Sequence, residues 1–302
     1  MAGGSVFITG AGGFLGRAVV AKLSAQGDRR IVGLVRSLAR RTARSEGVSV
    51  SYVQGDILDP KSYAESLKNC DTVLHLAALT GKHAPDEYFK VNRDGTKVLL
   101  AEAARYGVRR FIFVSTIAAK FKNQQHYHYA QSKLEAEGLV KASSLKWTIV
   151  RPTMILGKES AVLGGLSKLA TLPIIPIFGD GRIRVQPVDV EDLAVILAAM
   201  LDDENLEART VEIGGPEVVS MESLMRSIRQ SKAGTKGKVV HLPVDPIAAC
   251  LGLMEPLLRP VLPITAGQMA SFRNEGTAEP DSWVAQRQAN MKTIEEMLRA
   301  AA

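Results

Sequence analysis

Cysteine and aromatic residues are scarce in this chain. Cys70 and Cys250 are the only cysteines among 302 residues, and neither has a partner at a metal-binding spacing. A framework of several disulfides is therefore excluded and no metal centre is expected, while the low thiol count favours a reducing compartment such as the cytoplasm. Aromatic residues make up 5% of the chain, so its core must come mainly from valine, leucine, isoleucine and alanine.

Long apolar runs and an amino-terminal signal are also missing. No stretch of about 18 or more uninterrupted apolar residues occurs, so we expect no membrane-spanning helix. An apolar run begins at Ser5 with no basic segment before it, so we expect no signal peptide. The segment 244–264 is apolar, but prolines and charged residues interrupt it. We expect it to form short helices and turns with one apolar face.

The first half of the chain alternates short β-rich runs with helical stretches. We predict strands at 6–9, 31–35, 50–53, 72–75, 111–114 and 148–150, and helices at 15–26, 38–45, 61–68, 88–106 and 129–143. Such alternation gives a parallel sheet with helices on both faces, and strands covered on both faces read as continuous apolar runs. The fold class predicted is therefore α/β, a Rossmann-type, doubly wound parallel sheet.

The rhythm changes after Pro152. We predict helices at 161–170, 190–201, 221–231 and 291–300, strands at 185–188, 210–213 and 238–242, and a stretch broken by proline and glycine at 173–181. We expect residues 1–153 and 184–215 to form a dinucleotide-binding domain. Residues 154–183 and 216–302 would then form a smaller, interleaved lobe that binds a small-molecule substrate.

A glycine-rich loop follows the first predicted strand. Gly10, Gly13 and Gly16 form the pattern G-x-x-G-x-x-G, and Phe14 and Leu15 open the helix that follows. Glycines at such positions permit a tight turn, a close approach of backbone N–H groups to a pyrophosphate, and close packing of helix on strand. The amino terminus of the helix adds partial positive charge. This context predicts binding of a nicotinamide dinucleotide.

Arginines gather around the second predicted strand of this basic chain, whose net charge is +7. They are Arg29, Arg30, Arg36, Arg40, Arg41 and Arg44, and we expect them at the adenosine end of the dinucleotide. About 20 residues after the glycine loop, where many NAD sites have an acidic residue, the chain has Arg36. A guanidinium there favours NADP(H), although NAD remains possible. No nucleic-acid module accompanies the charge, so no nucleic-acid partner is expected.

Two further features bear on the site. Asp56 and Ile57 follow the third predicted strand, where they would meet the adenine. Tyr129 and Lys133 are four residues apart and would share one helix face, so the lysine ammonium would lower the pKa of the phenol. Tyr127 has no lysine at that spacing, which selects Tyr129 as the acid or base.

Together these motifs resemble the short-chain dehydrogenase/reductase family, in its extended and atypical branches. The resemblance also rests on the segments 75–78, 91–96, 114–116, 151–153, 186–194 and 213–216. Those branches include nucleotide-sugar epimerases and dehydratases, hydroxysteroid dehydrogenases and an accessory subunit of respiratory complex I. The resemblance implies a homodimer formed through helices that flank the sheet.

The resemblance also implies roles for particular residues. Tyr129 would exchange the proton at a substrate carbinol or carbonyl, Lys133 would hold the nicotinamide ribose, and Thr116, or alternatively Ser115, would bind the substrate oxygen. The residues expected at the cofactor are Gly10, Gly13, Phe14, Leu15, Gly16, Arg36, Asp56, Ile57, Leu76, Ala77, Ala78, Asn92, Lys133 and Pro152.

Three functions follow as hypotheses. The first is an NADP(H)-dependent oxidoreductase acting on a small or apolar alcohol or ketone by hydride and proton transfer. The second is an epimerase or isomerase of a sugar-type substrate, which would use the cofactor transiently. The third is a non-catalytic, cofactor-binding accessory subunit. The same tyrosine and lysine serve the first two, so the sequence does not separate them.

Overall fold

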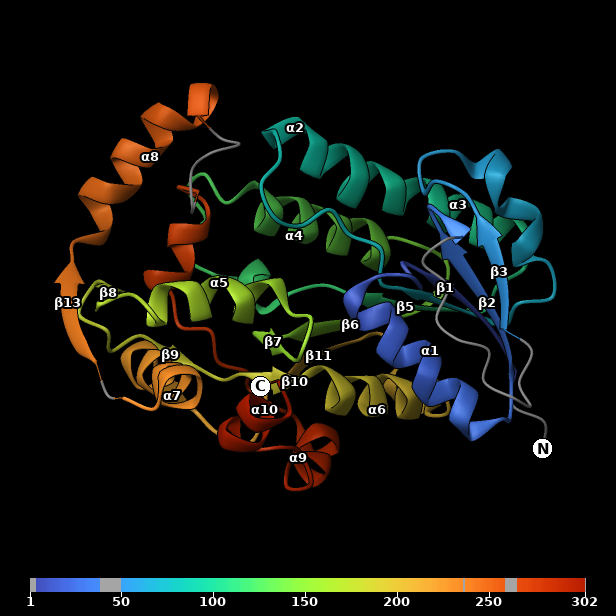
Figure 1. Ribbon diagram of the computed structural model, residues 1–302. Coiled ribbons are helices and arrows are strands. Elements are labelled where there is room, and N and C mark those ends of the chain that lie inside the picture. Colours follow the sequence, from blue (N-terminus) through green and yellow to red (C-terminus); the bar gives the residue numbers. More distant parts are fainter. Residues whose placement is uncertain (1–3, 39–49, 236, 259–264, 302) are drawn as a thin grey trace.

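A seven-stranded parallel sheet organises the amino-terminal part of the molecule in the computed structural model, which describes residues 4–38, 50–235, 237–258 and 265–301 (Figure 1). In spatial order the strands are β11 (Arg209–Ile213), β6 (Lys146–Pro152), β5 (Arg110–Val114), β4 (Thr72–His75), β1 (Ser5–Thr9), β2 (Arg30–Val35) and β3 (Val50–Gln54). The chain runs outward from β1 to β3 and then crosses to β4 and beyond. This is the predicted doubly wound sheet, and all six strands predicted in the first half are present.

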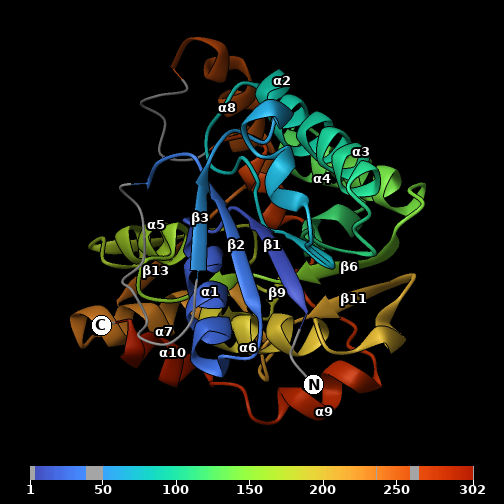
Figure 2. The same cartoon turned by 90° about the vertical axis from the view of Figure 1, so that its right-hand side faces the viewer.

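Helices cover both faces of the sheet. On one face α1 (Phe14–Gln26) and α6 (Val190–Met200) pack on side chains such as Ile8 and Val150. On the other, α3 (Gly95–Arg105) and α4 (His128–Lys141) pack on side chains such as Phe7 and Phe111. Figure 2 shows the strands from the β3 edge, between these two layers. Neighbouring residues of one strand thus enter opposite cores, which explains the continuous apolar runs.

Two predicted helices take other forms. The segment 61–68 forms two 3₁₀ turns, η2 (Pro60–Ser62) and η3 (Ala64–Leu67), because the Asp59 side chain caps the first turn and only a few residues remain before β4. The segment 88–106 is helical but begins as α2 (Pro85–Tyr88) and contains a π-helical turn, η4 (Phe89–Asp94), before α3. The predicted helix 38–45 lies mostly outside the described residues.

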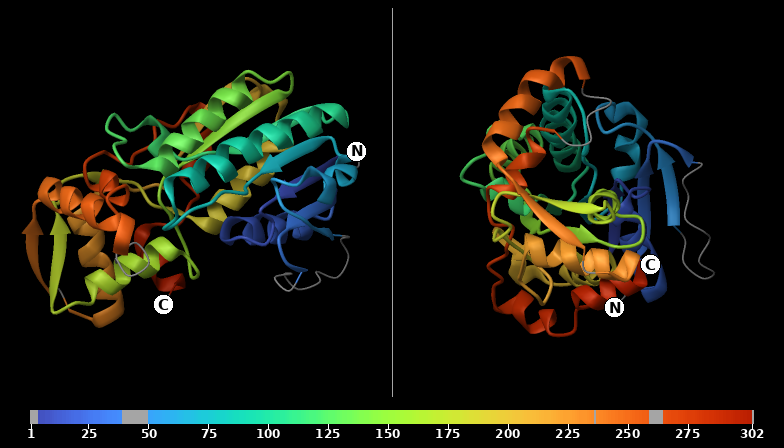
Figure 3. Two further views of the ribbon diagram at one scale, coloured as in Figure 1. Left: turned by 90° about the horizontal axis from the view of Figure 1, so that it is seen from above. Right: turned by 60° about the vertical axis from the view of Figure 1, so that its left-hand side comes forward.

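The carboxyl-terminal part forms a smaller lobe at one end of an elongated molecule (Figure 3). Its core joins α5 (Ala161–Ala170), β8 (Ile174–Phe178) and α7 (Met221–Ala233) through side chains such as Leu166, Ile177 and Leu224. The strand β13 (Lys238–Leu242) pairs with β8 in parallel. The strand β8 was not predicted, because the prolines and glycines around it suggested an irregular stretch.

Two further elements of the lobe differ from prediction. The single strand expected at 185–188 is split by Pro187 into β9 (Arg184–Val185) and β10 (Val188–Asp189), which pair with β12 (Val219–Ser220) and β7 (Ile155–Leu156). The expectation of short helices and turns over 244–264 is wrong for its first part, which is one helix, α8 (Val244–Leu258). Pro246 lies in the first turn of α8, where no backbone N–H is needed.

The remaining elements are short. They are η5 (Ile117–Lys120), η6 (Glu204–Leu206), η7 (Gln268–Phe272), α9 (Ser282–Gln288) and α10 (Ile294–Ala300). The last of these begins three residues after the predicted helix start, at a capping box formed by Thr293 and Glu296. Across the described ranges, no helix combines the length and apolar character needed to cross a membrane.

Candidate active site

The glycine loop is shaped by close backbone contacts. Gly10 has a φ of +69°, and a Cβ on it would lie 2.8 Å from the Ala77 nitrogen. A Cβ on Gly16 would lie 2.1 Å from the Gly10 carbonyl oxygen. Side chains at these two positions would therefore push β1, α1 and the segment after β4 apart, which is the packing requirement that the sequence predicts.

The amino terminus of α1 is open to an anion. Gly13 is its N-cap and provides no side-chain hydrogen bond, and the first turn contains no acidic residue. The helix dipole and the backbone N–H groups of this turn are therefore not neutralised by the protein's own carboxylates. Gly13 is exposed, and Phe14 and Leu15 are half-buried beside it. This arrangement fits the pyrophosphate of a dinucleotide.

Arg36 and Asp56 lie at the same edge of the sheet as the glycine loop. Thr9 pairs with Leu34, so Arg36, two residues later, follows β2 next to the loop, and its side chain is exposed. Asp56 follows β3 and accepts a hydrogen bond from the Leu58 N–H at 2.8 Å, as a turn aspartate does. Ile57 is buried against Gly95 of α3, so its side chain anchors the segment after β3.

The predicted arginine cluster is not a single group. Arg29 is buried and paired with Asp28 and Asp202, and Arg30 is the first residue of β2. Both therefore lie at the amino ends of the strands, opposite the glycine loop, because a strand separates them from Arg36. The expectation that they contact the adenosine end is wrong. Arg40, Arg41 and Arg44 lie outside the described residues.

A chain of hydrogen bonds forms the floor of the site. His75 at the end of β4 is 2.6 Å from the Thr9 hydroxyl and 2.9 Å from the Thr96 hydroxyl. Burial, and then the nearby Lys133 charge, lower the pKa of His75 well below its usual value, so this ring is neutral. The Thr9 hydroxyl also accepts from the Ala77 N–H. These bonds fix the half-buried segment Leu76, Ala77 and Ala78 against the glycine loop.

Asn92 fastens two backbone segments to each other. Its Oδ1 accepts from the Leu79 N–H at 2.7 Å, and its Nδ2 donates to the Leu79 carbonyl and to the Ser132 hydroxyl. Ser132 in turn donates to the Tyr129 carbonyl oxygen at 2.8 Å. The Asn92 amide is thus fully used within the protein. It connects the segment after β4 to the helix that carries Tyr129 and lies in the π-helical turn, a feature frequent at functional sites.

Tyr129 and Thr116 meet at the carboxyl end of β5. The Thr116 hydroxyl interacts with the Tyr129 phenol and lowers its pKa, and the Tyr129 ring is half-buried in the first turn of α4. This contact distinguishes Thr116 from Ser115, whose hydroxyl is buried and has no hydrogen-bond partner. An unpaired hydroxyl at this depth is costly, and a bound group could satisfy it. Pro152 is buried at the end of the neighbouring strand β6.

Lys133 lies one turn after Tyr129 and is almost completely buried. Its ammonium group donates to the Val114 carbonyl at 2.8 Å and lies 3.9 Å from the centre of the Phe113 ring. Burial lowers the pKa of Lys133 to about 7, although the Glu137 carboxylate acts in the opposite direction.

The ionisation of Tyr129 differs from the sequence prediction. Burial raises its pKa well above the usual value, and the phenols of Tyr127 and Tyr88 raise it further, while the Thr116 hydrogen bond lowers it. Lys133 donates toward the sheet, so it is not among the groups that set this pKa. The expectation that Lys133 lowers the tyrosine pKa is therefore wrong for the protein as it stands, and Tyr129 is a phenol at neutral pH.

Tyr88 and Tyr127 are residues of the site that sequence reasoning missed. Their rings lie 6.4 Å and 6.0 Å from the Tyr129 ring, centre to centre. Tyr127 has no lysine four residues further on, and Tyr88 is distant from Tyr129 in sequence. The only sequence feature that points to Tyr127 is its position two residues before Tyr129.

The family now follows from comparison with known proteins. Residues 10–204 match the NAD(P)H-binding family. The chain belongs to this family. The match begins at Gly10 and includes the loop, Asn92, Thr116, Tyr129 and Lys133. Within the described residues, no group of three or more potential metal ligands occurs.

Two relatives and one solved structure show what this chain resembles. The chain is 36% identical over 197 residues to a ceramide reductase of Caulobacter vibrioides, a match that covers 65% of this chain and 60% of the relative. It is 29% identical over 222 residues to the mitochondrial 40 kDa subunit of NADH-ubiquinone oxidoreductase of Neurospora crassa, covering 72% and 57% of the two chains. The chain thus matches less than two thirds of the length of these relatives.

The solved structure shows the same fold over nearly the whole chain. It is a short-chain dehydrogenase/reductase superfamily protein from Agrobacterium tumefaciens with bound NAD. The TM-score is 0.70 at 20% identity, and the match covers 98% of this chain and 95% of the other. The resemblance to the extended and atypical short-chain dehydrogenases and reductases is confirmed.

Proposed function

We propose that this protein is an NADP(H)-dependent oxidoreductase that reduces the carbonyl group of an apolar ketone to an alcohol. The observation that carries this proposal is the position of Tyr129 beside the Thr116 hydroxyl, which lowers the Tyr129 pKa, at the sheet edge that holds the glycine loop. The Tyr129 phenol carries a proton at neutral pH. Such a group is suited to donate a proton to a carbonyl oxygen.

The cofactor would be held by the residues at this edge. Gly10, Gly13 and Gly16 would admit the pyrophosphate to the amino terminus of α1, and Arg36 would bind the 2′-phosphate of NADP(H). Asp56 and Ile57 would lie at the adenine. The segment Leu76–Ala78, with Pro152 and Lys133, would contact the nicotinamide half. When bound, the reduced nicotinamide supplies a hydride.

The protein's own residues would then manage the proton and the substrate oxygen. The substrate carbonyl oxygen would accept hydrogen bonds from the Thr116 and Tyr129 hydroxyl groups. The carbonyl oxygen would take the Tyr129 proton when the carbon receives the hydride and its two electrons from the bound cofactor, so the product would be an alcohol. The Tyr129 phenolate would then regain a proton from solvent. Lys133 would hold the ribose, and the unpaired Ser115 hydroxyl would donate to the bound cofactor or substrate.

Two observations support an apolar substrate. The phenol is flanked by the Tyr88 and Tyr127 rings, and the lobe near it contains a cluster with Phe178, Met269 and Phe272. The relative with 36% identity is named a ceramide reductase. We propose that residues 1–153 and 184–215 hold the cofactor, while residues 154–183 and 216–302 hold the substrate.

The test is turnover with a matched pair of tyrosine variants. NADPH would be mixed with a panel of apolar ketones, including phenanthrenequinone, and the loss of reduced-nicotinamide absorbance followed. We expect Tyr129→Phe to lower kcat by about 100-fold or more, the usual contribution of a positioned general acid. Tyr106→Phe is the control, because this hydroxyl donates to Glu65 at the far end of α3. Full activity of Tyr129→Phe would refute the mechanism.

Two other results would assign the alternative functions. Conversion of a sugar-type substrate with no net absorbance change would identify an epimerase or isomerase. Tight NADPH binding without turnover, together with a stable larger complex, would identify an accessory subunit.

A further inference from the structure

The loop that precedes Tyr129 is held by a distant part of the chain. A Cβ on Gly267, which precedes η7, would lie 2.4 Å from the His126 carbonyl oxygen, so the two backbones are in direct contact. Asn274, at the other end of η7, donates to the Asn123 carbonyl at 3.0 Å and accepts from the Asn123 N–H. The segment 267–274 therefore contacts the loop 123–127 near both of its ends, a contact that we call the grip.

Tyr127 connects this grip to the reaction centre. A Cβ on Gly267 would lie 3.1 Å from the Tyr127 Cα, and the Ser271 side chain, in the middle of η7, interacts with the Tyr127 hydroxyl and lowers its pKa. The Tyr127 ring lies 6.0 Å from the Tyr129 ring at 48° and 6.5 Å from the Phe121 ring at 29°. The Tyr127 side chain thus touches the lobe with its hydroxyl and Tyr129 with its ring.

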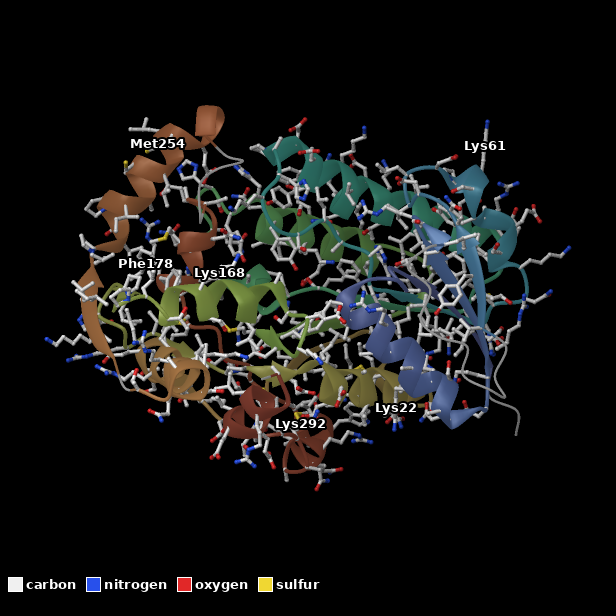
Figure 4. The ribbon with its side chains drawn as sticks, in the orientation of Figure 1. Lys22, Lys61, Lys168, Phe178, Met254 and Lys292 are labelled. Carbon is white, nitrogen blue, oxygen red and sulfur yellow. The ribbon has the colours of Figure 1, made fainter. Side chains whose placement is uncertain are left out.

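We propose that Tyr127 is a positioning residue for the reaction, held by Ser271, and that it transmits the placement of the lobe segment 267–274 to the Tyr129 phenol. The proposal rests on the function proposed above. Tyr127 lies between the lobe segment 267–274 and Tyr129, so a shift of η7 would move the ring that packs on Tyr129. The interior of η7 also packs on α8 and β8 through Met269 and Phe272, which places the grip within the apolar part of the lobe (Figure 4 shows Phe178 in this region).

The polar groups around Tyr129 support the same role. The groups facing its phenol are Tyr127 from the loop, Tyr88 from α2 and the Thr116 hydroxyl from the end of β5. Lys133, on the same helix, donates away from it to the Val114 carbonyl. Tyr127 is the larger of the two phenol contributions that raise the pKa of Tyr129. Removal of the Tyr127 hydroxyl is therefore expected to lower that pKa.

The experiment compares two variants that break the same contact from opposite sides. Tyr127→Phe removes the hydroxyl and keeps the ring, and Ser271→Ala removes its partner. NADPH-dependent reduction of phenanthrenequinone would be measured across pH, with Tyr106→Phe as control. For both variants we expect kcat to fall about three- to tenfold, the effect of one net hydrogen bond, while KM changes less than twofold. The alkaline limb of the kcat profile should move to lower pH in Tyr127→Phe.

A second readout needs no turnover. The tyrosinate absorbance would be titrated with pH in the wild type and in Tyr127→Phe, and again after adding Tyr129→Phe to each. The difference within each pair isolates the ionisation of Tyr129. We expect this step at lower pH in Tyr127→Phe than in the wild type. Retained NADPH binding would show that each variant is folded, and if Tyr127→Phe does not fold, Ser271→Ala carries the kinetic test.

The outcomes separate this inference from the proposed function. If Tyr129→Phe abolishes turnover, but kcat, its pH profile and the tyrosinate step are unchanged in the folded variants, Tyr127 is only a packing residue and the inference is wrong. If Tyr129→Phe is as active as the wild type, the proposed mechanism itself fails, and the positioning role fails with it.

Discussion

Lys133 is a buried basic group whose ionisation links the site to stability. Its pKa of about 7 in the folded protein lies below its ordinary value of 10.5, so the unfolded chain binds this proton more tightly. The burial of this charged lysine therefore lowers the free energy of unfolding. This loss is fully present below pH 7 and disappears as the pH rises toward 10.5. The unfolding free energy of the wild type should therefore rise relative to Lys133→Met over this range, by about 2–4 kcal/mol. Urea unfolding at a series of pH values measures the difference, and parallel profiles would contradict the assigned pKa.

Arg36 is the residue on which the choice of cofactor depends. We expect Arg36→Ala to weaken NADPH binding about tenfold or more, because a charge-assisted hydrogen bond contributes about 1.5–3 kcal/mol. NADH binding should change little, since NADH lacks the 2′-phosphate. Arg30→Ala is the matched control, because Arg30 is an exposed arginine at the opposite end of the same strand. Calorimetric titration with both cofactors decides the matter, and equal losses for NADPH and NADH would contradict the assignment.

Single-residue predictions from the sequence succeeded where the decisive contact is local. The four-residue spacing of Tyr129 and Lys133 does place both on α4. The direction of the Tyr129 pKa could not be predicted, because it depends on Tyr88, on the Thr116 hydroxyl and on burial between segments distant in sequence. The pairing of the buried Arg29 with the exposed Asp202 likewise joins residues that no local pattern connects.

At the scale of elements, the junction of β1 and α1 makes a sharp prediction. Gly16→Ala would place a Cβ 2.1 Å from the Gly10 carbonyl oxygen, so α1 must move away from the loop. We expect a loss of about 1–3 kcal/mol in stability, typical of overpacking, and a loss of at least tenfold in dinucleotide affinity.

The control for this change is Gly138→Ala, in α4. A Cβ on Gly138 would meet nothing within 4 Å, and alanine stabilises a helix interior by about 0.5–1 kcal/mol relative to glycine. Thermal unfolding and cofactor titration of the two variants should therefore give opposite changes in stability and a loss of affinity only for Gly16→Ala. Tight binding by Gly16→Ala would show that the loop does not hold the dinucleotide.

Element types were predictable where one signal dominated. The strands of the sheet are apolar runs, and α1 begins at a glycine loop and ends at Gly27 in a left-handed conformation. The strand β8 and the helix α8 were not predictable, because prolines near both suggested irregular chain. Their form is set by tertiary contacts, such as the pairing of Ile175 with Val239 and the packing of Leu251 in the cluster that includes Phe178.

At the scale of the whole molecule, the sequence indicated two interleaved parts but not how they meet. The strand β11 extends the sheet beside β6 although more than fifty residues separate them, and η7 returns to the loop before Tyr129. Contacts between such distant segments leave no periodic signal. The grip of the lobe on that loop therefore emerged only from the folded chain, and it lies between the parts to which we assign cofactor and substrate.

Assembly of two chains remains a prediction, based on the resemblance. The helices α3 and α4 form an outer layer of the sheet, and Leu134 on α4 is 43% exposed. If this layer is the dimer interface, a charge in its centre would be buried without a partner, which costs several kcal/mol. Leu134→Glu should then give a monomer by sedimentation. Val195→Glu is the matched control, because Val195 is a 46% exposed residue on α6, across the sheet, and this variant should remain dimeric. A dimer that only Val195→Glu disrupts would place the interface on the other face of the sheet. A monomeric wild type would contradict the predicted dimer.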